Sequence, residues 1–242
     1  MTRARGRVLV AIALLAVAAA GLAFALKPRP APIAPSASAK PVLLLLTSLP
    51  LMFDEDFSLD GGGSPALTAL QARYRVVPIS TTDGAELAKG RLLLMAHPLA
   101  QTAENLVVLD SWVRRGGRVL LLADPLLEWP SKRPLGDALR PPPMFADTGL
   151  LAHWGLRLDA PDQRGTKPAR LGGFEVVTAS PGALYGDGDC RMEEARLAAH
   201  CRIGTGKATV IADADLLDVP DLGKGAEHNL DAILSELSAL QH

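Results

Sequence analysis

The sequence of 242 residues contains few aromatic side chains and only two cysteines. Phenylalanine, tryptophan and tyrosine together make up 4% of the chain, whereas proteins that hold single-stranded nucleic acid need exposed aromatic rings on which bases stack. The chain also lacks a Gly-x-Ser-x-Gly sequence, the turn that exposes the serine nucleophile of many α/β hydrolases. No motif in the sequence therefore specifies a reaction.

Basic residues are scarce after the first forty positions. Residues 1–40 hold six basic residues and no acidic one, which leaves 19 basic against 26 acidic residues in 41–242, a net charge of −7. Because contact with a phosphate backbone requires clustered lysine and arginine, we expect no nucleic-acid partner. Of the whole composition, 48% is hydrophobic, which is ample for a buried core.

The start of the chain has the pattern of an exported protein. Three arginines within residues 1–7 precede an uncharged apolar run from Val8 to Leu26, and positive charge before an apolar stretch marks the cytoplasmic side of a membrane segment. About nineteen helical residues span roughly 28 Å, close to the roughly 30 Å of a bilayer core. We therefore expect a basic cytoplasmic N-terminus over 1–7 and a transmembrane signal-anchor over 8–26.

Two processing outcomes remain open at this segment. The tripeptide Ala23-Phe24-Ala25 fits the small-residue site at which signal peptides are cleaved, while the length of the apolar run favours a retained anchor. Residues 27–41, which contain five prolines, predict a Pro/Ala-rich linker. Residues 42–242 then form the extracytoplasmic domain.

The pattern of this domain indicates an α/β fold with an open, mostly parallel, flavodoxin-like sheet. Short hydrophobic runs typical of strands covered on both faces alternate with helical segments. The expected strands are Val42–Thr47, Arg75–Ile79, Arg91–Ala96, Arg118–Ala123 and Ala208–Ala212, and the expected helices are Pro65–Ala72, Thr102–Arg115 and Asn229–Leu240. Ser64 before the first of these helices is typical of an N-cap.

An insertion from about 126 to 202 interrupts this alternation. It begins with a proline-rich stretch and continues with a short helix expected at Asp147–Trp154 and strands near Phe174–Thr178, Arg191–Glu194 and Leu197–Arg202. We expect this insertion to form a small antiparallel cap or an extension of the sheet edge.

The two cysteines fall within this insertion. If Ala195 and Arg196 formed the turn of a hairpin, Cys190 and Cys201 would stand opposite each other, and an oxidising compartment would favour a disulfide between them. Two free buried thiols, or a catalytic thiol, are the alternatives.

Polar residues follow three of the expected strands, at the carboxyl edge where open α/β sheets bind ligands. His97 and Asp124 each precede a proline directly after a strand, and Glu128 and Trp129 lie on the loop that leaves this edge. They are candidates for a ligand or partner site, with His97 and Asp124 as base and orienting acid if the protein is an enzyme. Alternatively, these residues end strands and cap turns, and Trp129 packs in the core.

Asp213 follows the last expected strand and joins the same candidate edge. Asp215 and Asp218 come shortly after it, but their spacing does not match a calcium-binding loop, so turn or helix capping is expected and no metal is assigned. Residues 203–207 (IGTGK) stand before a strand rather than between a strand and a helix. A turn leading into the strand is therefore expected there rather than a phosphate loop.

Three stretches carry a family resemblance: residues 91–125 (RLLLMAHPLAQTAENLVVLDSWVRRGGRVLLLADP), 203–218 (IGTGKATVIADADLLD) and 228–237 (HNLDAILSEL). They resemble the GldG-like or DUF4350 group of bacterial membrane proteins over residues 42–125 and 203–240. The resemblance implies a domain related in fold to class I glutamine amidotransferases that accompanies uncharacterised ABC-type transport systems. It also implies a single-pass protein of the bacterial inner membrane with its C-terminal domain in the periplasm.

The same resemblance argues against catalysis. Amidotransferases of this fold carry a cysteine nucleophile on a sharp strand-to-helix turn, whereas both cysteines here lie in the insertion. We therefore expect a non-enzymatic accessory or binding module with no catalytic residue and no cofactor, whose partners are the membrane and ABC-type transporter membrane subunits. The alternatives are an extracytoplasmic hydrolase or amidotransferase-like enzyme, and a solute-binding protein, which would need two lobes closing on a cleft.

Overall fold

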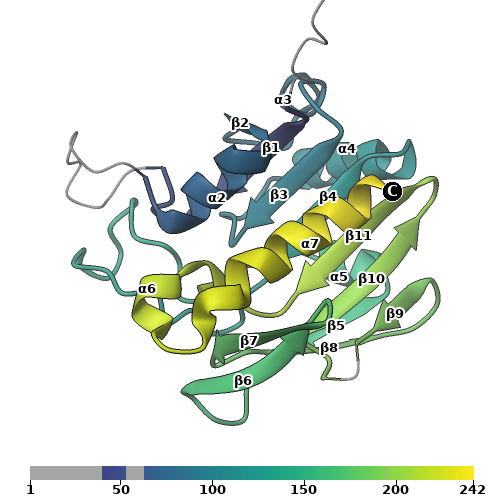
Figure 1. Cartoon of the computed structure of the whole chain (residues 1–242). Coiled ribbons are helices and arrows are strands. Elements are labelled where there is room, and N and C mark those ends of the chain that lie inside the picture. The colour runs from purple at the N-terminus through teal and green to yellow at the C-terminus, as the bar shows by residue number, and fades with distance from the viewer. Residues whose placement is uncertain (1–39, 53–62, 194) are drawn as a thin grey trace, which may run out of the picture. The chain divides into compact units, whose positions relative to one another are not determined.

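The computed structural model describes residues 40–52, 63–193 and 195–242 (Figure 1). The basic N-terminus, the signal-anchor and most of the linker lie outside the described residues, so these expectations stay predictions. Among the helices of the described part, none combines the length and the apolar character that a membrane crossing needs.

A seven-stranded sheet runs through the described residues in the order β2-β1-β3-β4-β11-β10-β9. Neighbouring strands are parallel among the first five of these strands. Beyond them, β10 pairs antiparallel with β11, and β9 pairs antiparallel with β10. The expected α/β fold with an open, mostly parallel sheet is confirmed. The strands are β1 (Val42–Thr47), β2 (Arg75–Pro78), β3 (Leu92–Ala96), β4 (Arg118–Leu122), β9 (Cys190–Met192), β10 (Ala198–Ile203) and β11 (Gly206–Ile211).

The helices begin where the sequence provides caps. The Ser64 hydroxyl accepts a hydrogen bond from the N–H of Leu67 at the start of α2, and the Thr102 hydroxyl accepts one from Asn105 at the start of α4. The helical elements are α2 (Pro65–Arg73), α3 (Gly84–Leu87), α4 (Ala103–Arg114), α5 (Leu150–His153), α6 (Val219–Leu222) and α7 (Asn229–Gln241), with short 3-10 turns η1 (Asp215–Leu217) and η2 (Ala226–His228).

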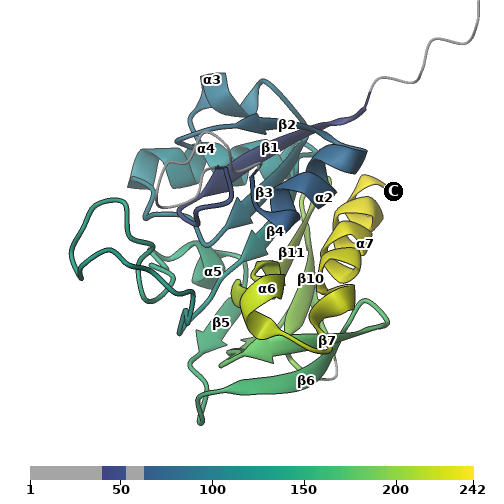
Figure 2. The ribbon, with the colours of Figure 1, turned by 60° about the vertical axis from the view of Figure 1, so that its left-hand side comes forward.

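The sheet separates two hydrophobic layers because successive strand residues point to opposite faces. In β1, Leu43 and Leu45 pack with buried residues of α2 and α7, while Leu44 and Leu46 pack with those of α4 and α5. Figure 2 shows α2 and α7 on one side of the sheet and α4 on the other. Strands covered on both faces explain the nearly continuous leucine runs of the sequence.

The insertion forms both structures that were considered for it. Its strands β9 and β10 extend the main sheet, while β5 (Leu156–Asp159) pairs with β8 (Ala183–Gly186) and β6 (Thr166–Leu171) pairs with β7 (Phe174–Ala179) in two antiparallel ribbons. Strands β5, β6 and β8 were not predicted. Most residues of β6 are exposed and one is a proline, so this strand has no hydrophobic pattern to reveal it.

The segment 203–207 forms the hairpin between β10 and β11. Ile203 pairs with Gly206, and Gly204 between them has φ +61°, a conformation that glycine adopts without steric cost. The structure therefore has a turn at this point and no strand-to-helix phosphate loop.

Gly206 lies against the end of α4. A Cβ atom at this position would lie 2.0 Å from the carbonyl oxygen of Val113 and 2.4 Å from that of Gly117. A Cβ atom at Gly84, the first residue of α3, would meet no atom within 4 Å.

We expect Gly206→Ala to lower the free energy of unfolding by about 2–3 kcal/mol, because backbone atoms must move to admit the methyl group. The matched Gly84→Ala change should alter it by less than about 1 kcal/mol. Chemical denaturation of both variants measures the difference, and equal stability of the two would contradict the close approach of β11 to α4.

Candidate functional site

The carboxyl ends of β4 and β11 meet because the two strands are parallel neighbours, with Leu122 in register with Ile211. Asp124 follows β4 and Asp213 follows β11, and both side chains are fully buried. Residues 89 positions apart in the sequence thus come together at the edge where α/β folds bind ligands.

Both carboxyl oxygens of Asp124 accept backbone hydrogen bonds. Oδ1 accepts from the N–H of Leu126 at 2.8 Å, and Oδ2 accepts from the N–H of Ala214 at 2.8 Å. The first bond closes the turn after β4, and the second ties that turn to the segment after β11. Asp124 therefore caps turns, as the structural interpretation of the sequence expected.

Asp213 makes the equivalent bonds on its own side. Its Oδ2 accepts from the N–H of Ala179 at the end of β7, 2.9 Å away, and its Oδ1 accepts from the N–H of Leu216 in η1, 3.2 Å away. This side chain therefore connects the β6–β7 ribbon to the main sheet.

A third carboxyl group, that of Asp215, completes what we call the aspartate cluster: Asp124, Asp213 and Asp215. One oxygen from each lies within 4.8 Å of the others, and all three side chains are buried. The Asp215 Oδ2 atom accepts a hydrogen bond from the N–H of Glu128 at 2.9 Å. Carboxylates at this spacing can hold a cation, but here five backbone N–H groups already donate into the cluster.

Burial and mutual repulsion favour the protonated forms of these groups. Burial raises the pKa of Asp124 to about 6, and the nearby Glu128 carboxylate adds to the rise. Burial and the neighbouring carboxylates raise the pKa of Asp215 to about 7 and that of Asp213 well above its usual value. Near neutral pH the cluster thus holds protons, which relieves the repulsion between its members.

His97 lies at the same edge but does not face a catalytic partner. Its Nε2 atom lies 2.8 Å from the carbonyl oxygen of Pro142, so Nε2 carries the proton, and its Nδ1 atom has no hydrogen-bond partner among the described residues. Burial lowers the pKa of His97, which keeps the ring neutral. No hydrogen bond within the described part of the chain joins His97 to Asp124, so the proposed base and orienting acid do not form a pair in this structure.

Glu128 and Trp129 also have structural contacts. The Glu128 Oε1 atom accepts a hydrogen bond from the Ser180 hydroxyl at 2.7 Å, and the half-buried Trp129 packs against the core on the α2 and α7 side of the sheet. Part of the Trp129 ring therefore packs against the core, and the rest stays accessible.

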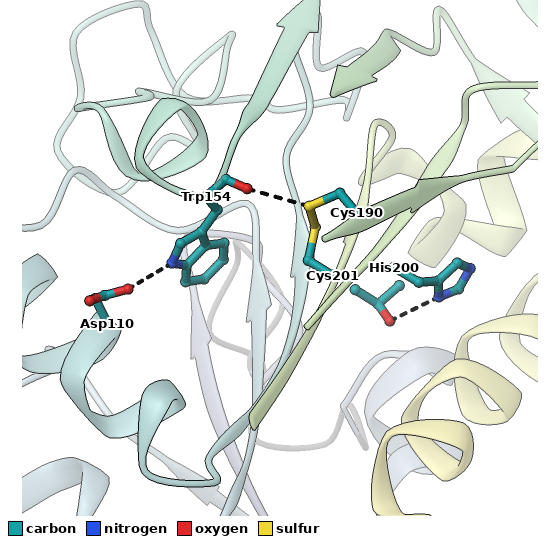
Figure 3. The surroundings of a disulfide bond; sticks show 6 residues. Asp110, Trp154, Cys190, His200 and Cys201 are labelled. Atoms are coloured by element: carbon teal, nitrogen blue, oxygen red, sulfur yellow. Dashed lines mark hydrogen bonds between the residues drawn. A yellow bond between two sulfur atoms is a disulfide. The ribbon is translucent and has the colours of Figure 1, made fainter. Parts of the chain in front are cut away.

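The cysteines form a disulfide that links the two antiparallel strands at the sheet edge. Cys190 pairs in register with Cys201, and their sulfur atoms are bonded. Figure 3 shows the bond beside Trp154, whose indole N–H donates to Asp110 at 3.1 Å. The disulfide therefore packs on the α4 and α5 side of the sheet.

One polar residue that the sequence analysis did not select is buried on the other side. Glu236 of α7 is 4% exposed and lies near His200 of β10. The available signal was its position in the apolar stripe of the helix, since Glu236 stands three residues after Ile233 and four before Leu240.

The α/β fold is similar to that of two solved structures over most of this chain. The mmIFT52 N-terminal domain is 13% identical to the chain with a TM-score of 0.54, over 81% of this chain and 97% of that domain. The Cytoplasmic Protein STM3548 from Salmonella typhimurium is 12% identical with a TM-score of 0.50, over 83% and 98%. At such identities the likeness shows the fold alone.

A weaker likeness extends to longer enzymes. The exo-beta-1,4-mannosidase Op5Man5 from Opitutaceae bacterium strain TAV5 is 14% identical with a TM-score of 0.46, over 84% of this chain and 36% of that one. The chain thus spans about a third of that enzyme's length. No protein-family model matches the chain, and no curated protein matches it.

The raised pKa values make stability depend on pH. For Asp215, the unfolded chain loses its proton near the ordinary pKa of about 4, whereas the folded chain keeps it up to about pH 7. The contribution of this group to the free energy of unfolding is therefore fully present below pH 4 and is lost as the pH rises through about 7.

We expect Asp215→Asn to reduce this loss of stability at high pH. The amide oxygen of asparagine can still accept the hydrogen bond from the Glu128 N–H, and the side chain carries no charge. The variant should be more stable than the wild type by roughly 1–3 kcal/mol at pH 7.5 and should differ little at pH 4. Denaturation curves from pH 4 to 8 test this, with the exposed Asp162→Asn as the control. An unchanged pH dependence in Asp215→Asn would contradict the proton-holding cluster.

Proposed function

We propose that this chain is a membrane-anchored, non-enzymatic α/β module in the periplasm of a bacterium, where it binds partners as an accessory component of an ABC-type transport or envelope complex. The supporting observation is how the acidic side chains at the carboxyl edge of the sheet are buried and hydrogen-bonded. Asp124 and Asp213 are fully buried there, and each of their oxygens accepts a backbone N–H. Two acidic side chains at the edge where α/β folds bind ligands thus hold loops together.

The disulfide supports an extracytoplasmic location. Disulfides form and persist in oxidising compartments such as the bacterial periplasm, and Cys190 and Cys201 are joined at a strand pair in register. The basic and apolar segment at the start of the sequence is the feature that would deliver the domain there.

A surface suited to a protein partner lies on α4. Val107 of this helix is 66% exposed and Leu99 before it is 53% exposed. Val107 also lines a cavity of about 350 Å³, together with Leu106, Leu150 and Asp110. Exposed apolar side chains rimmed by polar groups are typical of protein interaction sites.

The test is recovery of the complex from its membrane. We expect the full chain, purified from detergent-solubilised membranes, to co-purify with the membrane subunits of an ABC-type transporter. Val107→Glu should abolish this recovery without loss of stability, because the side chain is exposed. Ala195→Glu, at an exposed site in the β9–β10 turn, is the control and should leave it intact. Recovery of the chain without any such subunits would refute the proposal.

A second candidate is an extracytoplasmic hydrolase or amidotransferase-like enzyme that uses the carboxyl edge of the sheet. It is favoured by the backbone of His97, which has φ +47°, because strained backbone concentrates at active sites. The Nδ1 atom of His97, which has no partner in the described part of the chain, also favours it.

His97→Asn separates the two candidates. Asparagine tolerates the left-handed conformation but has no imidazole, so a binding module should keep its function. We expect the variant to complement a strain lacking the gene as well as the wild type does. Loss of complementation by a variant that is folded and present at normal levels would favour the enzyme.

A further inference from the structure

A second polar cluster lies on the face of the sheet turned away from the disulfide. In β10, Cys201 points toward α4 and α5, whereas its neighbour His200 points to the opposite face, as Figure 3 shows. His200 is in register with Thr209 of β11 and Arg191 of β9. The same face of the sheet is covered by α7.

Two carboxylates flank the His200 ring. Its Nε2 atom lies 3.3 Å from Oε1 of Glu193 in the turn after β9, and its Nδ1 atom lies 3.6 Å from Oε2 of Glu236 in α7. One donor atom from each of the three residues lies within 4.8 Å of the others. The three residues come from separate elements and converge only in the folded chain.

Glu236 lacks the partners that a buried carboxylate needs. Its side chain is 5% exposed, and its Oε2 atom has no hydrogen-bond partner among the described residues. A buried polar atom without a partner costs free energy, and this one is directed at His200. Burial raises the pKa of Glu236, an effect that Arg191 and His200 oppose.

The surroundings leave room for the Glu236 carboxylate. Gly172, in the turn between β6 and β7, has φ +56°, and a Cβ atom there would lie 2.6 Å from Oε1 of Glu236. The N–H of the same Gly172 donates to Oε1 of Glu193 at 3.3 Å. This turn thus approaches both carboxylates and positions one of them.

We propose that Glu193, His200 and Glu236 bind a divalent cation of the first transition series, such as Zn²⁺. One imidazole and two carboxylates suit these ions, and three protein ligands leave a coordination position for water. Ligand atoms of a tetrahedral zinc ion lie about 3.4 Å apart. The three donor atoms lie within 4.8 Å of one another, so binding requires the side chains to rotate and bring them closer.

The hydrogen bonds around His200 suit this role. The Thr209 hydroxyl lies 3.3 Å from Nδ1 of His200, and a polar neighbour of this kind holds the orientation of a histidine ligand. Of the three proposed ligands, His200 lines a cavity of about 500 Å³, together with Thr209 and Leu240. The site does not depend on the partner of the complex proposed above.

Titration of the full chain with ZnCl₂ tests the proposal. The untagged protein, purified in detergent and stripped of metal with a chelator, should bind one Zn²⁺ in competition with a chromogenic chelator. Glu236→Gln and His200→Gln should each weaken the affinity at least tenfold. At zinc concentrations about a hundredfold above the dissociation constant, the Tm of the wild type should rise by roughly 5–10 °C, and that of the variants should not.

Two further variants control for misfolding of the protein and for zinc binding elsewhere on its surface. Glu193 lies in a turn and not in the buried helix α7. The Glu193→Gln variant should therefore show the same tenfold loss of zinc affinity even if the Glu236→Gln variant folds poorly. His228→Gln removes an exposed histidine that lies 3.6 Å from the Asp231 carboxylate and should leave zinc binding unchanged. Absence of zinc binding in the wild type, or undiminished binding in a folded Glu193→Gln or Glu236→Gln variant, would overturn the proposal.

Discussion

Four backbone N–H groups from three separate segments donate to two buried carboxyl groups, and the loops at the carboxyl edge of the sheet depend on these bonds. The Asp124 carboxyl group accepts hydrogen bonds from the N–H groups of Leu126 and Ala214. The Asp213 carboxyl group accepts them from the N–H groups of Ala179 and Leu216. Without these acceptors the N–H groups of Ala179, Ala214 and Leu216 would be buried and unpaired, at a cost of about 1–3 kcal/mol apiece. The interactions connect the loop after β4, the loop after β11 and the end of the β6–β7 ribbon.

The start of α7 fixes that ribbon from a second direction. The buried Asn229 side chain accepts a hydrogen bond from the Val177 N–H and donates to the Val177 carbonyl oxygen. A side-chain amide thus takes the place of a neighbouring strand at this residue of β7. The insertion is therefore bound to the main sheet by polar contacts at its base and along its edge, which explains how a long excursion between β4 and β11 packs in one defined position.

The central strands and the longer helices could be predicted from the sequence because the patterns that indicate them are local. A leucine run such as Val42–Thr47 and caps such as Ser64 and Thr102 act over a few residues. The ribbons were harder, because β6 is mostly exposed and contains Pro168. For the candidate edge, position after a strand selected Asp124 and Asp213, but their role in binding backbone N–H groups depends on loops that only tertiary packing brings together. Glu236 and His200 are 36 positions apart, and their meeting follows from the placement of α7 on β10 and β11.

The outermost strands of the main sheet are its shortest ones. At one side β2 has four residues, the last of them Pro78, and at the other side β9 has three residues and is covalently tied to β10. Strands of this kind give an incoming peptide few free backbone groups with which to pair. A protein that docks at either edge of the main sheet must therefore recognise side chains and surface shape, so that specificity there resides in residues that can change without altering the sheet.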